Sequence, residues 1–257
     1  MGHIEILRDV PSNAEGVSRT LRIFTPSRYH QDPSARFGVV YMQDGQNVFA
    51  HPASACFPTW SANLTLERLI DEGRVSPWMI VAVDHGEGRF DDYSPWDDPR
   101  LKVRGRAERY ARFLLDELKP WVDRTYRTRP EATATAVAGS SLGGLASLYL
   151  GWRHGDTFGR VGAFSPSVMW CNGELFRQWN ARPLRFTRLY LDAGAKEHLH
   201  LDGEPMPYGE KVGEFHLHLR KLGYSEDELK LVLEPGGQHS EADWARRLPA
   251  ALTWFLT

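Results

Sequence analysis

A serine framed by glycines is the residue whose setting in this sequence best suits nucleophilic chemistry. Residues 139–143 read Gly-Ser-Ser-Leu-Gly, the pattern Gly-x-Ser-x-Gly centred on Ser141. The pattern lies between a predicted strand at 134–140 and a predicted helix at 142–153. A sharp turn between such elements is crowded and needs small residues two positions away on each side of the nucleophile. The spacing therefore indicates Ser141, rather than Ser140, as a nucleophile for acyl transfer.

Acyl transfer also needs a base and a group that stabilises an oxyanion, and the sequence offers candidates for both. The backbone N–H of Leu142 opens the predicted helix, where positive partial charge collects. A serine hydroxyl is a weak nucleophile and requires a base. Among the ten histidines, His239 follows the last predicted strand, 230–236, and comes after the serine in the expected chain order.

The acid that would orient this histidine is not decided by spacing. It is expected between the serine and the histidine in the chain, and it must stabilise the charged imidazole. Asp192 lies near the end of the predicted strand 188–194, Glu197 lies on the following loop, and Asp202 and Glu204 come next. Since Asp192 also suits a buried structural role, the residues alone leave Asp192 and Glu197 open.

Strand-like and helical segments alternate along the chain, which predicts an α/β fold with a mostly parallel sheet and helices on both faces. In such sheets chemistry gathers at the carboxyl ends of strands, where Ser141 and His239 fall. No linker-like segment separates two apolar regions, so we expect one domain over residues 1–257. The predicted strands are 3–10, 19–26, 37–44, 78–84, 134–140, 159–166, 188–194 and 230–236, and the predicted helices are 63–72, 106–124, 142–153, 173–180, 209–222 and a last one capped by Ser240.

Composition argues against several classes of protein. The 31 Lys and Arg are balanced by 33 Asp and Glu, with no basic stretch, so no nucleic-acid partner is expected. No apolar run approaches the roughly 20 residues of a membrane span, and residues 1–10 show no signal pattern. The two cysteines, Cys56 and Cys171, are too few for a disulfide framework, which favours the cytoplasm. No histidine spacing suits a metal site.

Six longer segments resemble the putative esterase family of α/β-hydrolases. This family includes esterase-D-like enzymes, enterochelin-type siderophore esterases, feruloyl esterase modules and mycolyl transferases. The resemblance covers nearly the whole chain. Its segments are VVYMQDGQNVF (39–49), IVAVDHGEGRFDDYSPW (80–96), FLLDELKPWVDRTYRT (113–128), VAGSSLGGLASLYLGWRHGDTFGRVGAFSPSVMW (137–170), LYLDAGAKE (189–197) and PGGQHSEADWARRLPAAL (235–252).

The resemblance implies an α/β-hydrolase fold and a role for particular residues. Ser141 matches the family's nucleophile and His239 its base. The family's acid follows the glycine of the DAG segment by three or four residues, a position that falls on Glu197. The turn at 44–47 resembles the family's second oxyanion donor, through the backbone N–H of Gln46.

The expected activity is hydrolysis of a carboxylic ester through a Ser-His-Glu triad and an acyl-enzyme. The expected partner is a small-molecule ester, with no cofactor, no metal and no membrane. An acyltransferase with the same triad and a catalytically silent α/β-hydrolase scaffold that binds a ligand are the alternatives. Trp60 and Trp170 lie on predicted loops near strand ends and are candidates for substrate contact. Arg89 resembles a recurring family position near the pocket and is a third candidate.

Overall fold

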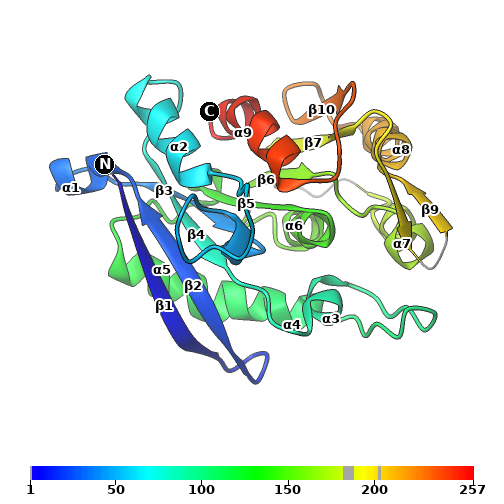
Figure 1. Ribbon diagram of the computed structural model, residues 1–257, viewed down its shortest axis with the longest axis horizontal. Helices are drawn as coiled ribbons and strands as arrows, with labels where there is room; N and C mark the ends of the chain where they lie inside the picture. The colour runs from blue at the N-terminus through cyan, green and yellow to red at the C-terminus, as the bar shows by residue number, and fades with distance from the viewer. Residues whose placement is uncertain (1, 182–187, 202–203) are drawn as a thin grey trace.

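The computed structural model describes residues 2–181, 188–201 and 204–257. Its centre is an eight-stranded sheet in the order β1-β2-β4-β3-β5-β6-β7-β10 (Figure 1). The first two strands form an antiparallel hairpin at one edge, β2 pairs antiparallel with β4, and every other neighbouring pair is parallel. The strands of this sheet are β1 (His3–Ser12), β2 (Val17–Thr25), β3 (Gly38–Met42), β4 (Trp78–Val83), β5 (Thr135–Ser140), β6 (Arg160–Phe164), β7 (Arg188–Gly194) and β10 (Leu229–Glu234).

Helices cover both faces of the sheet, which confirms the predicted fold class. On one face α2 and α9 pack against each other, as Figure 1 shows, and the remaining long helices lie on the other face. Every predicted helix is found within a few residues of its expected bounds. The helices are α1 (Ser27–Gln31), α2 (Ala62–Asp71), α3 (Arg89–Tyr93), α4 (Ala107–Arg112), α5 (Lys119–Thr125), α6 (Leu142–Arg153), α7 (Trp170–Gln178), α8 (Tyr208–Lys221) and α9 (Glu241–Phe255).

Alternation along the strands divides the core into two layers. In β3, Val39 and Tyr41 belong to the larger apolar cluster, which includes side chains of α4 to α8. Val40 and Met42 belong to the smaller cluster, which includes side chains of α2 and α9. Successive side chains of a strand point to opposite faces, so a strand covered on both sides is apolar throughout.

Several features differ from the predicted elements, and the short helices α1 and α3 were not predicted. The helix expected over 106–124 consists of α4, a π-helical stretch Phe113–Leu118 and α5, end to end. A separate antiparallel pair, β8 (His198–Leu201) and β9 (Glu204–Pro207), follows β7 and was not predicted. Each of its strands has four residues, too few to show a periodic pattern.

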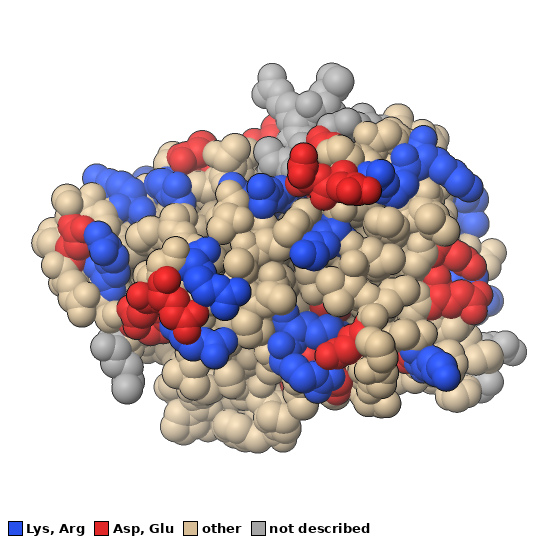
Figure 2. All heavy atoms as spheres, turned by 90° about the horizontal axis from the view of Figure 1, so that it is seen from above, with Lys and Arg blue, Asp and Glu red and all other residues tan. Residues whose placement is uncertain are grey.

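The surface carries both signs of charge. Figure 2 shows basic and acidic side chains interspersed over the face seen from above, with no field of one sign. Among the described residues, no helix has the length and apolar character needed to cross a bilayer.

Candidate active site

Three strand ends at one edge of the sheet supply the candidate catalytic residues. Ser141 directly follows β5, Glu197 lies three residues beyond the end of β7, and His239 lies five residues beyond the end of β10. The strands β5, β6, β7 and β10 are consecutive parallel neighbours. The carboxyl ends of parallel strands meet at the same edge, so these loops lie together although up to 98 residues separate them in the chain.

Ser141 occupies the strained turn that its glycine neighbours predict. Its φ of 56° and ψ of −124° lie outside the regions that non-glycine residues prefer. A Cβ on Gly139 would lie 2.7 Å from the carbonyl carbon of Gly143. A Cβ on Gly143 would lie 3.0 Å from the Cβ of Gln43. Neither flanking position has room for a side chain. The N–H of Ser141 donates to the carbonyl of Phe164 at 3.0 Å, which ties the turn to the next strand.

The two backbone donors expected for an oxyanion are free to act. Leu142 is the first residue of α6, and its N–H points out of the helix like the other first-turn donors. Gln46 lies in a short 3₁₀ turn whose orientation is set by two contacts. Its carbonyl accepts from the N–H of Ala55 at 2.9 Å, and its side-chain oxygen accepts from the N–H of His85 at 3.2 Å. Within the described ranges, neither the Leu142 nor the Gln46 N–H donates to a protein acceptor.

Glu197 is the carboxylate that contacts the histidine. Its Oε1 lies 2.5 Å from Nδ1 of His239. Its Oε2 accepts from the N–H of Gly194 at 2.7 Å and from the hydroxyl of Ser165 at 2.9 Å. Burial alone would raise the pKa of Glu197, but the hydrogen bonds from His239, Gly194 and Ser165 outweigh it and hold the pKa below the usual value. The site therefore presents an ionised carboxylate to the imidazole.

Backbone contact brings the loops of Glu197 and His239 together. A Cβ on Gly194, at the end of β7, would lie 2.0 Å from the carbonyl oxygen of Gly237, in the loop that carries His239. Only glycine permits this approach. The result is that the two loops start from adjoining backbone, so the glutamate side chain can span the remaining distance.

Asp192, the other candidate acid, has different partners. It is completely buried, and its Oδ2 lies 3.0 Å from Nε of Arg247. It also accepts from the N–H of Ser165 and the hydroxyl of Tyr190, each at 3.2 Å. Burial raises the pKa of Asp192 to about 6, against the opposing effect of Arg247. Asp202 lies outside the described residues.

Ser141 and His239 line the same cavity, of about 300 Å³. Among the described residues no hydrogen bond joins their side chains, a common state of an unliganded site, where the contact tightens when substrate binds.

Tyr208 packs against the candidate base, His239. Its ring centroid is 4.5 Å from that of His239, and its hydroxyl is 3.0 Å from Oγ of Ser167. Burial raises the pKa of Tyr208, and hydrogen bonds with Ser167 and Ser141 counteract the rise.

The cavity contains two of the three residues expected to contact substrate. Trp60 lines it and packs edge to face on Phe164, with ring centroids 4.9 Å apart. Arg89 also lines it, but donates from Nε at 2.7 Å and Nη2 at 2.8 Å to the carboxylate of Asp44. The full lining is Asp44, Asn47, Trp60, His85, Arg89, Ser140, Ser141, His239, Glu241 and Trp244.

Trp170 is not part of this lining. It lines a neighbouring cavity of about 410 Å³ and stacks on Phe90, with ring centroids 5.9 Å apart. Its indole N–H donates to the hydroxyl of Ser94 at 3.0 Å, which holds the ring toward that cavity. The expected contact of Trp170 with the cavity of Ser141 is therefore not found.

The residues that hold Glu197 in place were not among the candidates predicted from the sequence. Ser165 directly follows β6, at the same edge as the candidate triad, and its position after a strand is a signal that was available. Arg247 and Trp244 lie on α9 and donate to the Ser165 hydroxyl at 3.1 and 3.0 Å. Their α-helical setting carries no sign of this role, because the contacts form between distant segments.

Comparison with known proteins places the fold and the family. The chain is 24% identical over 243 residues to the uncharacterised protein YbbA of Bacillus subtilis, covering 93% of this chain and 92% of that one. A ferulic acid esterase superposes with a TM-score of 0.75 at 18% identity, covering 100% and 98% of the two chains. An IroE-like serine hydrolase from Shewanella oneidensis superposes with a TM-score of 0.79 at 19% identity, covering 98% and 79%.

The family model described as "Putative esterase" matches residues 12–255, which is nearly the whole chain. The resemblance noted from the sequence is thereby confirmed. The chain belongs to the putative esterase family and is an ester hydrolase.

Proposed function

We propose that Ser141, His239 and Glu197 form the catalytic triad of this ester hydrolase. Ser141 Oγ attacks the ester carbonyl while His239 removes the hydroxyl proton. The N–H groups of Leu142 and Gln46 donate to the developing oxyanion. The bond to the alcohol oxygen then breaks, and His239 returns the proton to the leaving alcohol.

The acyl-enzyme is resolved by the same groups. His239 takes a proton from a water molecule, the water oxygen attacks the acyl carbon, and the bond to Ser141 breaks with return of the proton to its oxygen. Glu197 keeps Nδ1 of the imidazole protonated and stabilises its charged form. Each oxyanion donor of this kind contributes on the order of 3 kcal/mol to transition-state stabilisation. Every step uses only side chains, backbone and water.

One observation carries this proposal: Glu197 Oε1 lies 2.5 Å from His239 Nδ1, and His239 and Ser141 line the same cavity. The strained turn at Ser141 supports it, because backbone strain at a non-glycine residue is characteristic of nucleophile turns. We also propose that residues 1–257 act as a single domain, since both apolar clusters are built on one sheet.

The size and lining of the cavity favour a compact acyl group. Its volume of about 300 Å³ is at the small end of ligand pockets. Indole rings of Trp60 and Trp244 adjoin the charged side chains of Asp44, Arg89 and Glu241. We therefore expect p-nitrophenyl acetate and butyrate to be cleaved faster than the decanoate, as initial rates over a chain-length series would show.

The triad is tested by comparing Ser141→Ala with Ser140→Ala on p-nitrophenyl acetate. Ser141→Ala should lose nearly all hydrolysis with an unchanged far-UV circular dichroism spectrum, and a phosphonate should label Ser141 in the unaltered protein. Ser140, the preceding residue on β5, is the matched control and should have a much milder effect. Labelling at Ser140, or turnover by a folded Ser141→Ala protein, would contradict the assignment.

The acyltransferase alternative differs only in the acceptor. Adding an alcohol such as glycerol to the same assay and measuring acid and new ester by mass spectrometry separates the two. We expect acid to remain the main product. Predominant formation of the new ester would favour the transferase, and binding of an ester without turnover would favour the silent scaffold.

A further inference from the structure

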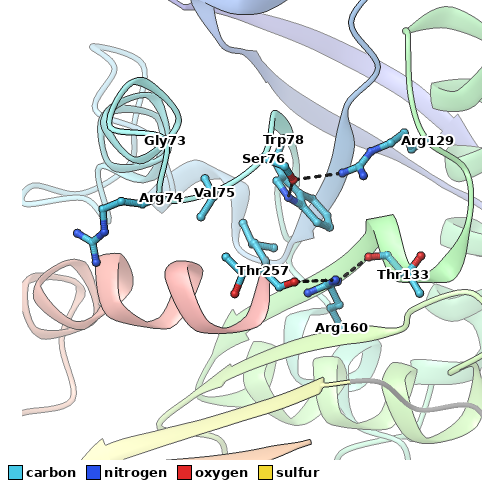
Figure 3. A pocket seen from close by; sticks show the side chains of 10 residues that line it. Gly73, Arg74, Val75, Ser76, Trp78, Arg129, Thr133, Arg160 and Thr257 are labelled. Atoms are coloured by element: carbon cyan, nitrogen blue, oxygen red, sulfur yellow. Dashed lines mark hydrogen bonds between the residues drawn. The ribbon is translucent and has the colours of Figure 1, made fainter. Parts of the chain in front are cut away.

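A second cavity lies at the opposite end of the sheet and is lined by arginines. Its volume is about 400 Å³, and Figure 3 shows Arg129 and Arg160 beside Trp78, with Arg74 at the rim and directed away from the ring. Trp78 and Arg160 are the first residues of β4 and β6, so the cavity lies at the amino ends of these parallel strands. A strand of five residues rises about 17 Å, so the length of the strands separates this cavity from the Ser141 site.

Two of the three arginines of this cavity, Arg129 and Arg160, lack an Asp or Glu partner among the described residues. The guanidinium carbons of Arg129 and Arg160 lie 5.7 and 5.8 Å from the centroid of the Trp78 ring. Among the described residues, neither Arg129 nor Arg160 pairs with an Asp or Glu side chain. Arg160 donates instead to the main-chain carbonyls of Thr133 at 2.5 Å and Phe255 at 2.7 Å. Nη2 of Arg160 lies 3.5 Å from the main-chain oxygen of Thr257.

Arg129 makes fewer hydrogen bonds than Arg160 among the described residues. Its Nη2 is 3.5 Å from Oγ of Ser76, and its buried Nε has no partner among the described residues. Arg74, at the rim, has only a 3.7 Å contact with the exposed carboxylate of Glu72. The lining thus presents guanidinium groups from three chain segments with unused donor capacity.

Arg129 and Arg160 are half-buried, and they differ from three other arginines of the protein that pair with a carboxylate. Arg22 pairs with Asp84 at 2.7 Å, Arg89 with Asp44 at 2.7 Å, and Arg247 with Asp192 at 3.0 Å. A charge that is partly withdrawn from water favours a partner of opposite sign.

The closeness of other arginines affects the pKa of Arg160. Burial, together with repulsion from Arg188 and Arg129, lowers the pKa of Arg160 to about 10. A bound anion would relieve this repulsion.

We propose that the cavity binds a small molecule through a phosphate or diphosphate group. Arginine forks match the oxygens of a phosphoryl group with paired, charge-assisted hydrogen bonds. The two adjoining guanidinium groups of Arg129 and Arg160 favour a multiply charged anion. The volume exceeds that of a single phosphate, and the apolar side chains of Val75 and Leu256 at its border suit the rest of an organic ligand. The site is separate from the proposed esterase chemistry and does not depend on it.

The proposal is tested by isothermal titration calorimetry of the full chain with inorganic pyrophosphate at low ionic strength. We expect saturable binding that Arg129→Gln weakens about tenfold or more, equivalent to about 1.4 kcal/mol or more. Arg112→Gln is the matched control, because Arg112 is an exposed arginine of α4 with a long contact of 3.8 Å to Glu108. It should leave the affinity unchanged.

Two further variants keep the test decisive. Arg74→Gln changes a rim residue with an exposed side chain, so it should weaken binding even if Arg129→Gln fails to fold. Arg89→Gln alters the cationic residue of the Ser141 cavity and should retain pyrophosphate binding. Loss of binding in Arg89→Gln would move the anion to that cavity and overturn the proposal.

Other outcomes would also overturn it. These are absence of binding heat with pyrophosphate, equal affinity in the unaltered protein and in folded Arg129→Gln and Arg74→Gln, or tighter binding of citrate than of pyrophosphate. The last result would identify a carboxylate site. Ester hydrolysis measured in parallel should be unaffected by Arg129→Gln, so failure of this proposal is distinguishable from failure of the proposed triad.

Discussion

The hydroxyl of Ser165 donates a 2.9 Å hydrogen bond to Oε2 of Glu197 and so connects the carboxylate that contacts His239 to a buried arginine. The same hydroxyl oxygen accepts from Nη2 of Arg247, whose Nε lies 3.0 Å from the carboxylate of Asp192. Two buried carboxylates at the end of β7 are thus kept apart by their partners. One contacts an imidazole and the other a guanidinium.

Removing the Ser165 hydroxyl should weaken the fold more than the chemistry. Ser165→Ala leaves the buried donors of Trp244 and Arg247 without their acceptor, at a cost of about 1–3 kcal/mol in the free energy of unfolding. Glu197 keeps its bond from the Gly194 N–H, so kcat should fall less than in Glu197→Gln. Urea denaturation and steady-state kinetics check both. Unchanged stability would contradict the network.

Substitutions of Glu197 and Asp192 should have different effects on kcat and on stability. Glu197→Gln should lower kcat by orders of magnitude with little change in Tm, because the imidazole loses the group that orients it and stabilises its charge. Asp192→Asn removes the fully buried carboxylate beside Arg247 and leaves the guanidinium paired, among the described carboxylates, with Glu234 alone at 3.0 Å, which should cost about 3 kcal/mol of stability. A well-folded Asp192→Asn protein without turnover, beside a nearly normal Glu197→Gln, would reverse the assignment.

Glu197 should make the free energy of unfolding fall as the pH is lowered. Burial acts to raise its pKa, but the bonds from His239 and the Gly194 N–H prevail and lower it below the ordinary value of 4.5. A depressed carboxylate pKa stabilises the fold above the unfolded value, and this contribution is lost as pH falls through the folded value.

The measurement is the free energy of unfolding of the unaltered protein and of Glu197→Gln over a pH series that descends from 7 through the region below 4.5. The unaltered protein should lose more stability on acidification than the variant, because the other carboxylates are common to both. Parallel curves for the two proteins would refute the prediction.

The charge of the substrate cavity should be adjustable at Asp44. This residue has a φ of 56°, a left-handed conformation that asparagine also adopts readily, so Asp44→Asn should keep the turn. The substitution leaves the Arg89 guanidinium without its matching charge. We expect kcat/KM for the p-nitrophenyl monoester of succinate to rise about fivefold relative to that for the neutral butyrate, consistent with about 1 kcal/mol for one solvent-exposed charge pair. An unchanged ratio of the two values would show that Arg89 does not face the acyl group.

Local pattern was sufficient to predict the strands of the main sheet, the long helices and the strained turn at Ser141. The strands between Gly38 and Gly194 are apolar because both faces are covered, and this is visible without knowing their neighbours. Ser141 was recognisable for a similar reason. The crowding of its turn involves residues only two positions away, so the requirement for Gly139 and Gly143 is written within five residues.

The choice of acid could not be made from local pattern, because it depends on which side chain meets which partner across the sheet. Asp192 and Glu197 are five residues apart, yet Asp192 pairs with Arg247 on α9 while Glu197 reaches His239 beyond β10. The close approach of Gly194 to the His239 loop sets this outcome.

The direction of the Trp170 indole and the gathering of Arg129 and Arg160 around Trp78 have the same origin. In each case the deciding contact joins segments that are distant in the chain, and the helix or strand pattern of either segment contains no record of it. Periodicity reports which face of an element is buried. Only packing determines which side chains then come within hydrogen-bonding distance of one another.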